Sequence, residues 1–158
     1  MPLATNQDPE QALYLALKQY TAEVRRDRRL PVPPARSVTL SSQDGSGTLT
    51  LDAIIEQSAV REIGYRVRAC SLGQATTAIL VRRASGLTQQ ELDRVRRQFE
   101  SLLQSGQGQC DWPELEVFAP ASVIPNRHDA ALLPFRALGE LFDPQRQDAA
   151  PGAKTEPL

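Results

Sequence analysis

Cys70 is the residue of this chain whose type and position best suit it for chemistry. It lies within residues 68–74, RACSLGQ, where a strand-like pattern gives way to a helical one. The first turn of a helix carries unpaired N–H groups and a partial positive charge, which favour an anion. A thiolate, which is both the nucleophile and the metal ligand, is favoured there over a thiol. The alternative is a small buried residue, because free cysteines are among the most buried residue types.

Few other groups suggest chemistry. His128 is the single histidine, and it is either a metal ligand or a solvated residue in the first turn of a helix. Cys110 lies in the loop 106–112 and is predicted to be an incidental thiol, with Trp112 packing that loop onto the core. The sequence has no phosphate-binding glycine loop, HExxH pair or Gly-x-Ser-x-Gly elbow, so we do not expect an enzyme.

Composition predicts one soluble domain, residues 1–142, followed by a short tail, 143–158. The chain has 158 residues, 41% hydrophobic and 23% charged, with a net charge of −1, so nothing indicates nucleic-acid binding. No apolar run approaches the roughly 20 residues that span a bilayer, and the N-terminus does not resemble a signal peptide. Two cysteines are too few for a disulfide framework, which favours a cytoplasmic location.

The first half of the chain predicts one helix and three strands. Asp8-Pro9-Glu10 has the cap, proline and acidic residue of a helix start. We expect this helix to run into the charged residues 25–29, and the proline-rich segment 31–34, PVPP, to end it. Alternating apolar residues predict strands at 37–41, 47–56 and 60–69. The Asp44-Gly45 pair is a hairpin signal, so the strands are expected to pair antiparallel.

The second half is expected to be mainly helical. A helix from Ser71 closes at Gly86. A capping box, Thr88 to Glu91, starts an amphipathic helix that we expect to pack on the sheet. Residues 115–118 are expected to be extended, residues 127–142 to form the last helix, and residues 143–158 to be disordered. The predicted class is α+β, a three-stranded antiparallel sheet packed against several helices.

Two segments resemble the NifU/IscU family of iron–sulfur cluster assembly scaffolds. Residues 65–78, YRVRACSLGQATTA, resemble its central motif, in which a strand ends at a cysteine that opens a helix of small residues. Residues 125–138, PNRHDAALLPFRAL, resemble its third-ligand region, especially in SufU-like members. The resemblance covers roughly residues 13–141, and it implies a SufE/NifU-like fold.

The resemblance also implies a ligand set, of which this chain keeps little. The family gathers three cysteines and an aspartate or histidine around a [2Fe–2S] cluster or zinc. Cys70 matches the second cysteine. The first-cysteine position falls on Asp44 or Gly45, and the third on Ala130.

Other donors are expected to stand near these positions. Asp44, His128 and Asp129 could offer oxygen or nitrogen to a metal beside Cys70, a set weak for a cluster and better suited to zinc. Arg127 matches a family arginine near the site.

The resemblance therefore predicts a scaffold-like protein that binds iron or a [2Fe–2S] cluster transiently and delivers it by protein contact. A cysteine desulfurase and other iron–sulfur assembly proteins are the expected partners. One alternative is a SufE-like sulfur acceptor that carries a persulfide on Cys70. Another is a ligand-depleted relative that only binds partners. The oligomeric state is left open.

Overall fold

The structure is a computed structural model that describes residues 8–43 and 45–143. Asp44 and nearly all of the predicted C-terminal tail, residues 144–158, lie outside the described residues, so the prediction of a disordered tail is not tested.

A three-stranded antiparallel sheet forms one layer of the molecule, as predicted. Its strands are β1 (Arg36–Ser41), β2 (Thr48–Glu56) and β3 (Ala59–Arg68), in the spatial order β1-β2-β3. The turn between β1 and β2 includes Gly45 at φ +75°, a left-handed backbone that glycine adopts without steric cost.

Alternation along β3 separates the two faces of the sheet. Tyr65 and Val67 are buried beneath the helices, whereas Arg66 and Arg68 point to the opposite, exposed face. This alternation confirms the strand predicted at residues 60–69, which the structure gives as Ala59–Arg68.

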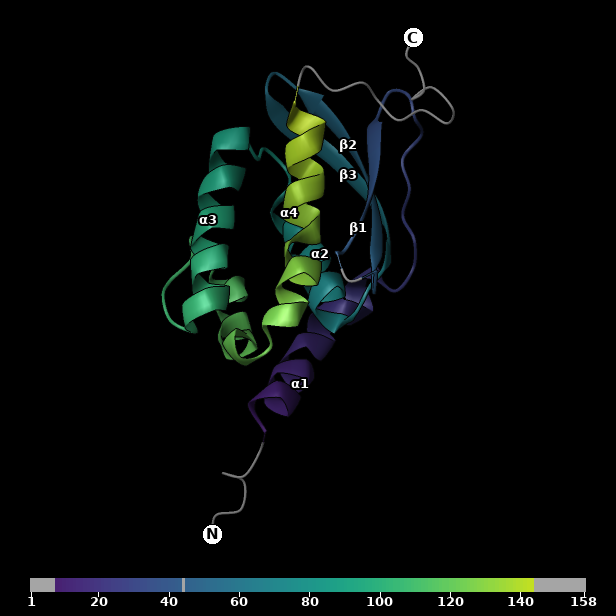
Figure 1. Ribbon diagram of the computed structural model, residues 1–158. Coiled ribbons are helices and arrows are strands. Elements are labelled where there is room, and N and C mark those ends of the chain that lie inside the picture. Colours follow the sequence, from purple (N-terminus) through teal and green to yellow (C-terminus); the bar gives the residue numbers. More distant parts are fainter. Residues whose placement is uncertain (1–7, 44, 144–158) are drawn as a thin grey trace.

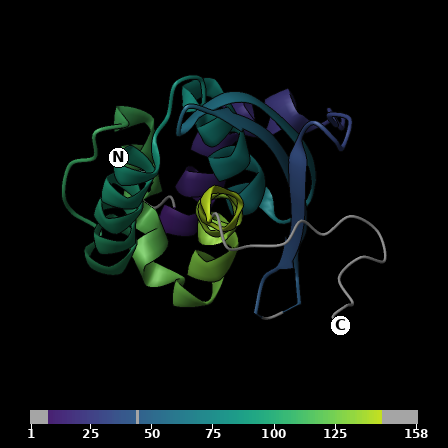
Figure 2. The same ribbon diagram turned by 90° about the horizontal axis from the view of Figure 1, so that it is seen from above.

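The helices lie in two further layers beside the sheet (Figures 1 and 2). The helices α2 (Ser71–Arg83) and α4 (His128–Phe142) pack against the sheet and against each other. The first helix, α1 (Pro9–Thr21), packs across α2. The outer layer is formed by α3 (Gln89–Ser105) and the 3₁₀ helix η3 (Pro113–Val123).

The predicted capping box of α3 is confirmed, but the predicted packing of α3 on the sheet is wrong. The Thr88 hydroxyl accepts from the Glu91 N–H, and the Glu91 carboxylate accepts from the Thr88 N–H. The apolar side of α3 instead faces α4 and η3, where the Phe99 ring lies 5.1 Å from that of Phe118 and 5.6 Å from that of Phe135. A periodic pattern identifies the buried side of a helix and not the layer that covers it.

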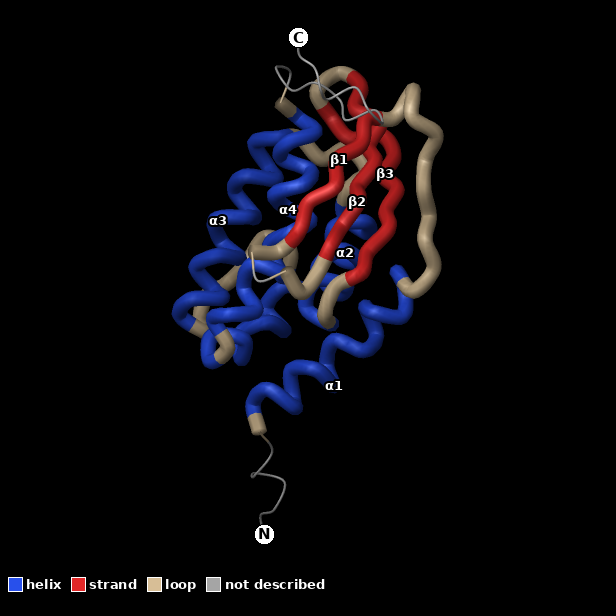
Figure 3. Tube along the Cα trace, turned by 45° about the vertical axis from the view of Figure 1, so that its right-hand side comes forward, coloured by secondary structure: helices blue, strands red, loops and turns tan. Residues whose placement is uncertain are grey.

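The first helix is shorter than predicted. It begins at Pro9 after an Asp8 cap, as expected, but ends at Thr21, and the 3₁₀ helix η2 (Ala22–Val24) follows. Beyond η2 the backbone of Arg28 pairs with that of Tyr65 at the edge of β3, with N···O distances of 2.9 and 2.7 Å. Figure 3 shows the loop after α1 running along the sheet toward β1. This long-range pairing satisfies backbone groups that a longer helix would have satisfied locally.

A buried carboxylate holds this loop in place. Asp52 of β2 has no exposed side-chain surface (0%), and it accepts from Arg29 Nε at 2.7 Å, Leu30 N at 3.0 Å and Ser37 Oγ at 2.8 Å. These bonds tie the chain between α1 and β1 to the centre of the sheet.

Two further boundaries differ from the prediction. Residues 115–118 belong to η3 and are not extended, because Leu115 and Phe118 are buried at the three-residue spacing of a 3₁₀ helix. The helix predicted from Ser71 to Gly86 ends at Arg83. Gly86, at φ +81°, forms the turn whose N–H reaches Val60 O at 2.8 Å. Among the described residues, no helix is long and apolar enough to cross a membrane.

Candidate functional site

Cys70 lies between the end of β3 and the start of α2, as the sequence predicts. It is the N-cap residue of α2, with extended φ and ψ angles of −67° and 174°, and its side chain makes no capping hydrogen bond. Its carbonyl oxygen accepts the first helical bond, from Gln74 N at 3.0 Å. The residue is half-buried and is not paired in a disulfide. Cys70 is therefore neither sealed in the core nor fully exposed.

Small residues let three segments meet beside Cys70. A Cβ placed on Gly73, in the first turn of α2, would lie 2.8 Å from Ala69 Cβ and 3.2 Å from the carbonyl oxygen of Ala130 in α4. A Cβ placed on Gly47, at the end of the β1–β2 turn, would lie 2.9 Å from Ala69 Cβ. The hairpin turn, the end of β3 and the starts of α2 and α4 thus approach each other nearly backbone to backbone.

This convergence brings together the three segments to which the resemblance assigns cysteine ligands. The described residues at those positions provide one sulfur, that of Cys70. Gly45 offers no side chain, and Ala130 is buried and apolar. Asp44, the alternative residue at the first position, lies outside the described residues.

Asp129 in the first turn of α4 contacts the hairpin turn, and both of its carboxylate oxygens accept hydrogen bonds. Oδ2 accepts the backbone N–H of Gln43 in the hairpin turn, and Oδ1 accepts from Arg136 Nη2 at 2.7 Å. Its role as a metal donor stays a prediction. A metal ion that bound Asp129 would compete with these hydrogen bonds.

His128 is held by a neighbour rather than solvated. Its Nε2 lies 2.7 Å from the carbonyl oxygen of Ala121 in η3. A carbonyl oxygen only accepts, so Nε2 carries the proton, and Nδ1 is the nitrogen that could bind a metal. The predicted metal role of His128 is likewise not tested.

Tyr14 of α1 is a neighbour of the site that sequence analysis missed. The pKa of its hydroxyl is raised, and burial is the main cause. The Arg127 guanidinium lowers this pKa, whereas the charges of Glu10 and Cys70 raise it. Tyr14 is therefore within electrostatic range of both Arg127 and Cys70. No spacing along the sequence links α1 to Cys70, because their proximity comes from the packing of α1 on α2.

No complete metal site forms within residues 8–43 and 45–143. No three His, Cys, Asp or Glu side chains there stand close enough together to hold an ion. The second cysteine does not join the site: burial, followed by the charges of Glu116 and Asp111, raises the pKa of the Cys110 thiol to about 11. Cys110 is thus a protonated, buried thiol, consistent with the predicted incidental role.

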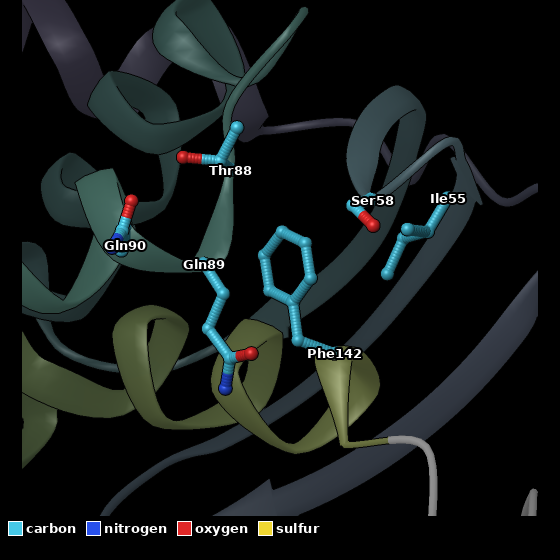
Figure 4. Close-up of a pocket in the computed structure, with 6 residues that line it drawn as sticks. All are labelled: Ile55, Ser58, Thr88, Gln89, Gln90 and Phe142. Carbon is cyan, nitrogen blue, oxygen red and sulfur yellow. The ribbon is translucent and has the colours of Figure 1, made fainter.

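A separate pocket opens at the far end of α4 (Figure 4). It has a volume of about 560 Å³ and is lined by residues that include Gln89 and Gln90 at the start of α3 and Phe142 at the end of α4. Cys70 lies near the other end of α4, which is roughly 20 Å away along a 15-residue helix. The lining contains no cysteine, histidine or acidic side chain, so this pocket is not part of the Cys70 site.

Comparison with known proteins relates the chain to solved structures alone. No protein-family model and no curated protein sequence matches it. A NifU-like protein (N-terminal) from Brucella abortus superposes with a TM-score of 0.72 at 21% identity, covering 85% of this chain and 94% of that one. A candidate iron–sulfur cluster assembly scaffold protein for the SUF system, from Fervidobacterium islandicum AW-1, superposes with a TM-score of 0.68 at 17% identity, covering 81% and 94%.

These likenesses bear on architecture, because the sequence identities are low. The order of elements, the antiparallel sheet and nearly the whole length of each solved chain are shared. The resemblance inferred from residues 65–78 and 125–138 is confirmed at the level of the fold. This chain therefore has the three-stranded α+β fold of the NifU-like and SUF-system scaffold proteins.

Proposed function

We propose that the protein acts in iron–sulfur cluster assembly as a scaffold-like protein that handles iron or a [2Fe–2S] cluster through Cys70. The observation that carries the proposal is the convergence of the hairpin turn, the end of β3 and the starts of α2 and α4 around one half-buried thiol. The likeness to scaffold proteins supports the general role. Fold alone does not assign function, so the argument depends on the chemistry at Cys70.

The donors in the chain do not complete a cluster site. A [2Fe–2S] cluster is normally held by four protein ligands, and Cys70 supplies one, while the imidazole of His128 and the carboxylate of Asp129 are hydrogen-bonded to other groups. We therefore propose that iron or the cluster is cargo, held by Cys70 together with donors of a second molecule and released by exchange between proteins. A cysteine desulfurase or another assembly protein is the proposed partner. Zinc, which accepts mixed nitrogen, oxygen and sulfur ligands, is a further candidate.

Anaerobic reconstitution with ferrous iron and sulfide, carried out with and without a cysteine desulfurase, tests this proposal. We expect visible absorbance and protein-bound iron that depend on Cys70 and that elute with an associated, multi-chain species. Cys70→Ser should remove both signals. Cys110→Ser is the matched control and should retain them, because Cys110 is buried away from the site. A colourless wild-type protein that binds no iron, or a Cys70→Ser variant that behaves like wild type, would contradict the proposal.

One observation favours a second function, sulfur carriage. Cys70 is one half-buried thiol at the N-terminus of a 13-residue helix, and among the described residues it belongs to no group of three or more His, Cys, Asp or Glu side chains that could hold a metal. Sulfur transfer needs only one cysteine. The Cys70 thiolate would attack the outer sulfur of a persulfide on the desulfurase, the S–S bond would break, and the desulfurase thiolate would leave.

Intact-mass measurement separates these functions. After incubation with a cysteine desulfurase and cysteine, a sulfur acceptor should gain the mass of one sulfur atom, lost again in Cys70→Ser. The absence of this gain would exclude the second function. If reconstitution and sulfur transfer both fail while the protein still binds assembly proteins, the remaining hypothesis is a ligand-depleted relative that acts by contact alone.

A further inference from the structure

We infer that Asp129 is a positioning residue, whose carboxylate fastens the β1–β2 turn to the start of α4 and so fixes one wall of the Cys70 site without a metal ion. The inference depends on the proposed function only in taking Cys70 as the reactive group.

The hydrogen bonds of Asp129 connect segments that are distant in the sequence. Its Oδ2 accepts the backbone N–H of Gln43, a residue 86 positions earlier in the chain. Its Oδ1 accepts from Arg136 Nη2 at 2.7 Å, and the Asp129 side chain is only 25% exposed. Arg136 stands two turns further along α4, so it orients the carboxylate while leaving Oδ2 directed at the turn. A hydrogen bond to a charged carboxylate is among the stronger kinds in proteins.

Hydrogen bonds join the described residues of the turn that Asp129 contacts. Ser42 N donates to Gly47 O at 2.9 Å, Gly45 N donates to Ser42 O at 2.9 Å, and Gly47 N donates to Ser42 Oγ at 3.0 Å. Because these bonds join the beginning of the turn to its end, holding Gln43 also holds Gly47.

Gly47 in turn lies against the residue that precedes Cys70. A Cβ placed on Gly47 would lie 2.9 Å from Ala69 Cβ and 3.1 Å from Ala69 Cα. The Asp129 carboxylate therefore acts on Cys70 through the turn and the end of β3, and not by contact with the sulfur. A metal ion bound by several segments would tie them together in the same way. Here the hydrogen bonds of Asp129 make that connection within the protein alone.

Amide hydrogen exchange and thiol alkylation test the inference in the full-length protein after treatment with EDTA. The amide of Gln43 should be protected in wild type. In Asp129→Ala it should exchange about tenfold faster or more, because a hydrogen bond to a charged group contributes at least that factor to a local opening equilibrium. Iodoacetamide should modify Cys70 at least about threefold faster in the same variant, as the wall beside it opens. Asp129→Asn retains an acceptor oxygen, so its rates of Gln43 exchange and Cys70 alkylation should lie between those of wild type and Asp129→Ala.

Asp27→Ala is the matched control. Asp27 also joins distant segments, through Arg68 Nη1 at 2.8 Å, but on the opposite, exposed face of the sheet. It should leave Gln43 exchange and Cys70 alkylation at wild-type rates, even where overall stability falls.

Three results would overturn the inference. The first is a Gln43 amide that exchanges at the wild-type rate in the Asp129 variants. If Asp129→Ala does not fold, the exchange rate in Asp129→Asn is the deciding measurement. The second is loss of Gln43 protection in wild type on EDTA treatment, which would assign the connection to a metal. The third is an equal effect of Asp27→Ala, which would indicate general loosening. Neither iron nor a sulfur donor is used, so failure of cluster reconstitution or of sulfur transfer would leave this test unaffected.

Discussion

Gly73 in the first turn of α2 lies directly against Ala130 in the first turn of α4. A Cβ on Gly73 would lie 3.2 Å from the Ala130 carbonyl oxygen, a backbone atom, and 2.8 Å from Ala69 Cβ, a side chain with no flexible end that could move aside. This contact sets how closely the two helices approach beside Cys70.

Gly73→Ala is therefore expected to destabilise the protein, although alanine is the better helix former. Overpacking costs about 1 to 3 kcal/mol, which offsets or exceeds the gain in helix propensity of about 1 kcal/mol. Urea denaturation followed by circular dichroism measures the change. The control is Gly139→Ala in α4, where the added Cβ would meet nothing within 4 Å. That variant should be more stable by roughly 0.5 to 1 kcal/mol, and equal gains in the two variants would contradict the tight contact.

Asp52 should make stability depend on pH in the acid range. Burial raises the pKa of the Asp52 carboxyl. Hydrogen bonds from Arg29, Leu30 N and Ser37, together with the charge of Arg29, lower this pKa by more, so the pKa in the folded protein is below its usual value. A carboxyl with a lowered folded pKa contributes stability above its unfolded pKa of about 3.9. That contribution is lost as the pH falls through the folded pKa.

Asp52→Asn should accordingly lower the free energy of unfolding by about 2 kcal/mol at pH 7, because the hydrogen bonds to a charged acceptor are weakened. The difference from wild type should shrink as the pH falls below 4. Unfolding curves at pH 7, 4 and 3 measure it. A difference that is constant over this range would show that the carboxylate charge does not matter.

The two thiols should differ sharply in reactivity. Burial and nearby acidic groups raise the pKa of Cys110 to about 11, so at pH 7.5 this thiol is protonated as well as inaccessible. Iodoacetamide should label the native protein once, at Cys70, and should label both residues in urea. Peptide mapping after each reaction identifies the site. Labelling of Cys110 in the native state would contradict its placement in the core.

The capping box of α3 should contribute measurably to stability. Thr88→Ala removes the hydroxyl that accepts the Glu91 N–H at 3.3 Å, and we expect a loss of about 1 kcal/mol. Glu91→Ala should cost less, because the remaining hydroxyl still caps the helix. Gln90→Ala is the control: Gln90 is exposed and takes no part in the box. Thermal unfolding of the three variants gives the order, and a Thr88→Ala variant as stable as the control would contradict it.

The sequence by itself determined the elements whose signals are local. The Asp8 cap, the Thr88–Glu91 box, the hairpin turn at Gly45 and the alternation along β3 each depend on neighbours within a few residues, and the structure confirms each of them. The position of Cys70 at the opening of α2 belongs to the same class, because a strand pattern and a helix pattern meet there.

The tertiary structure alone decided what covers each element and which groups meet. The backbone of Arg28 pairs with β3 instead of continuing the first helix. The helix α3 packs on α4 rather than on the sheet. Asp129 reached Gln43, and Tyr14 reached the surroundings of Cys70, across long separations in sequence. Such contacts depend on how whole elements pack and have no periodic signature along the chain. The sequence could therefore place Cys70 at the opening of α2, but not the contacts that surround it.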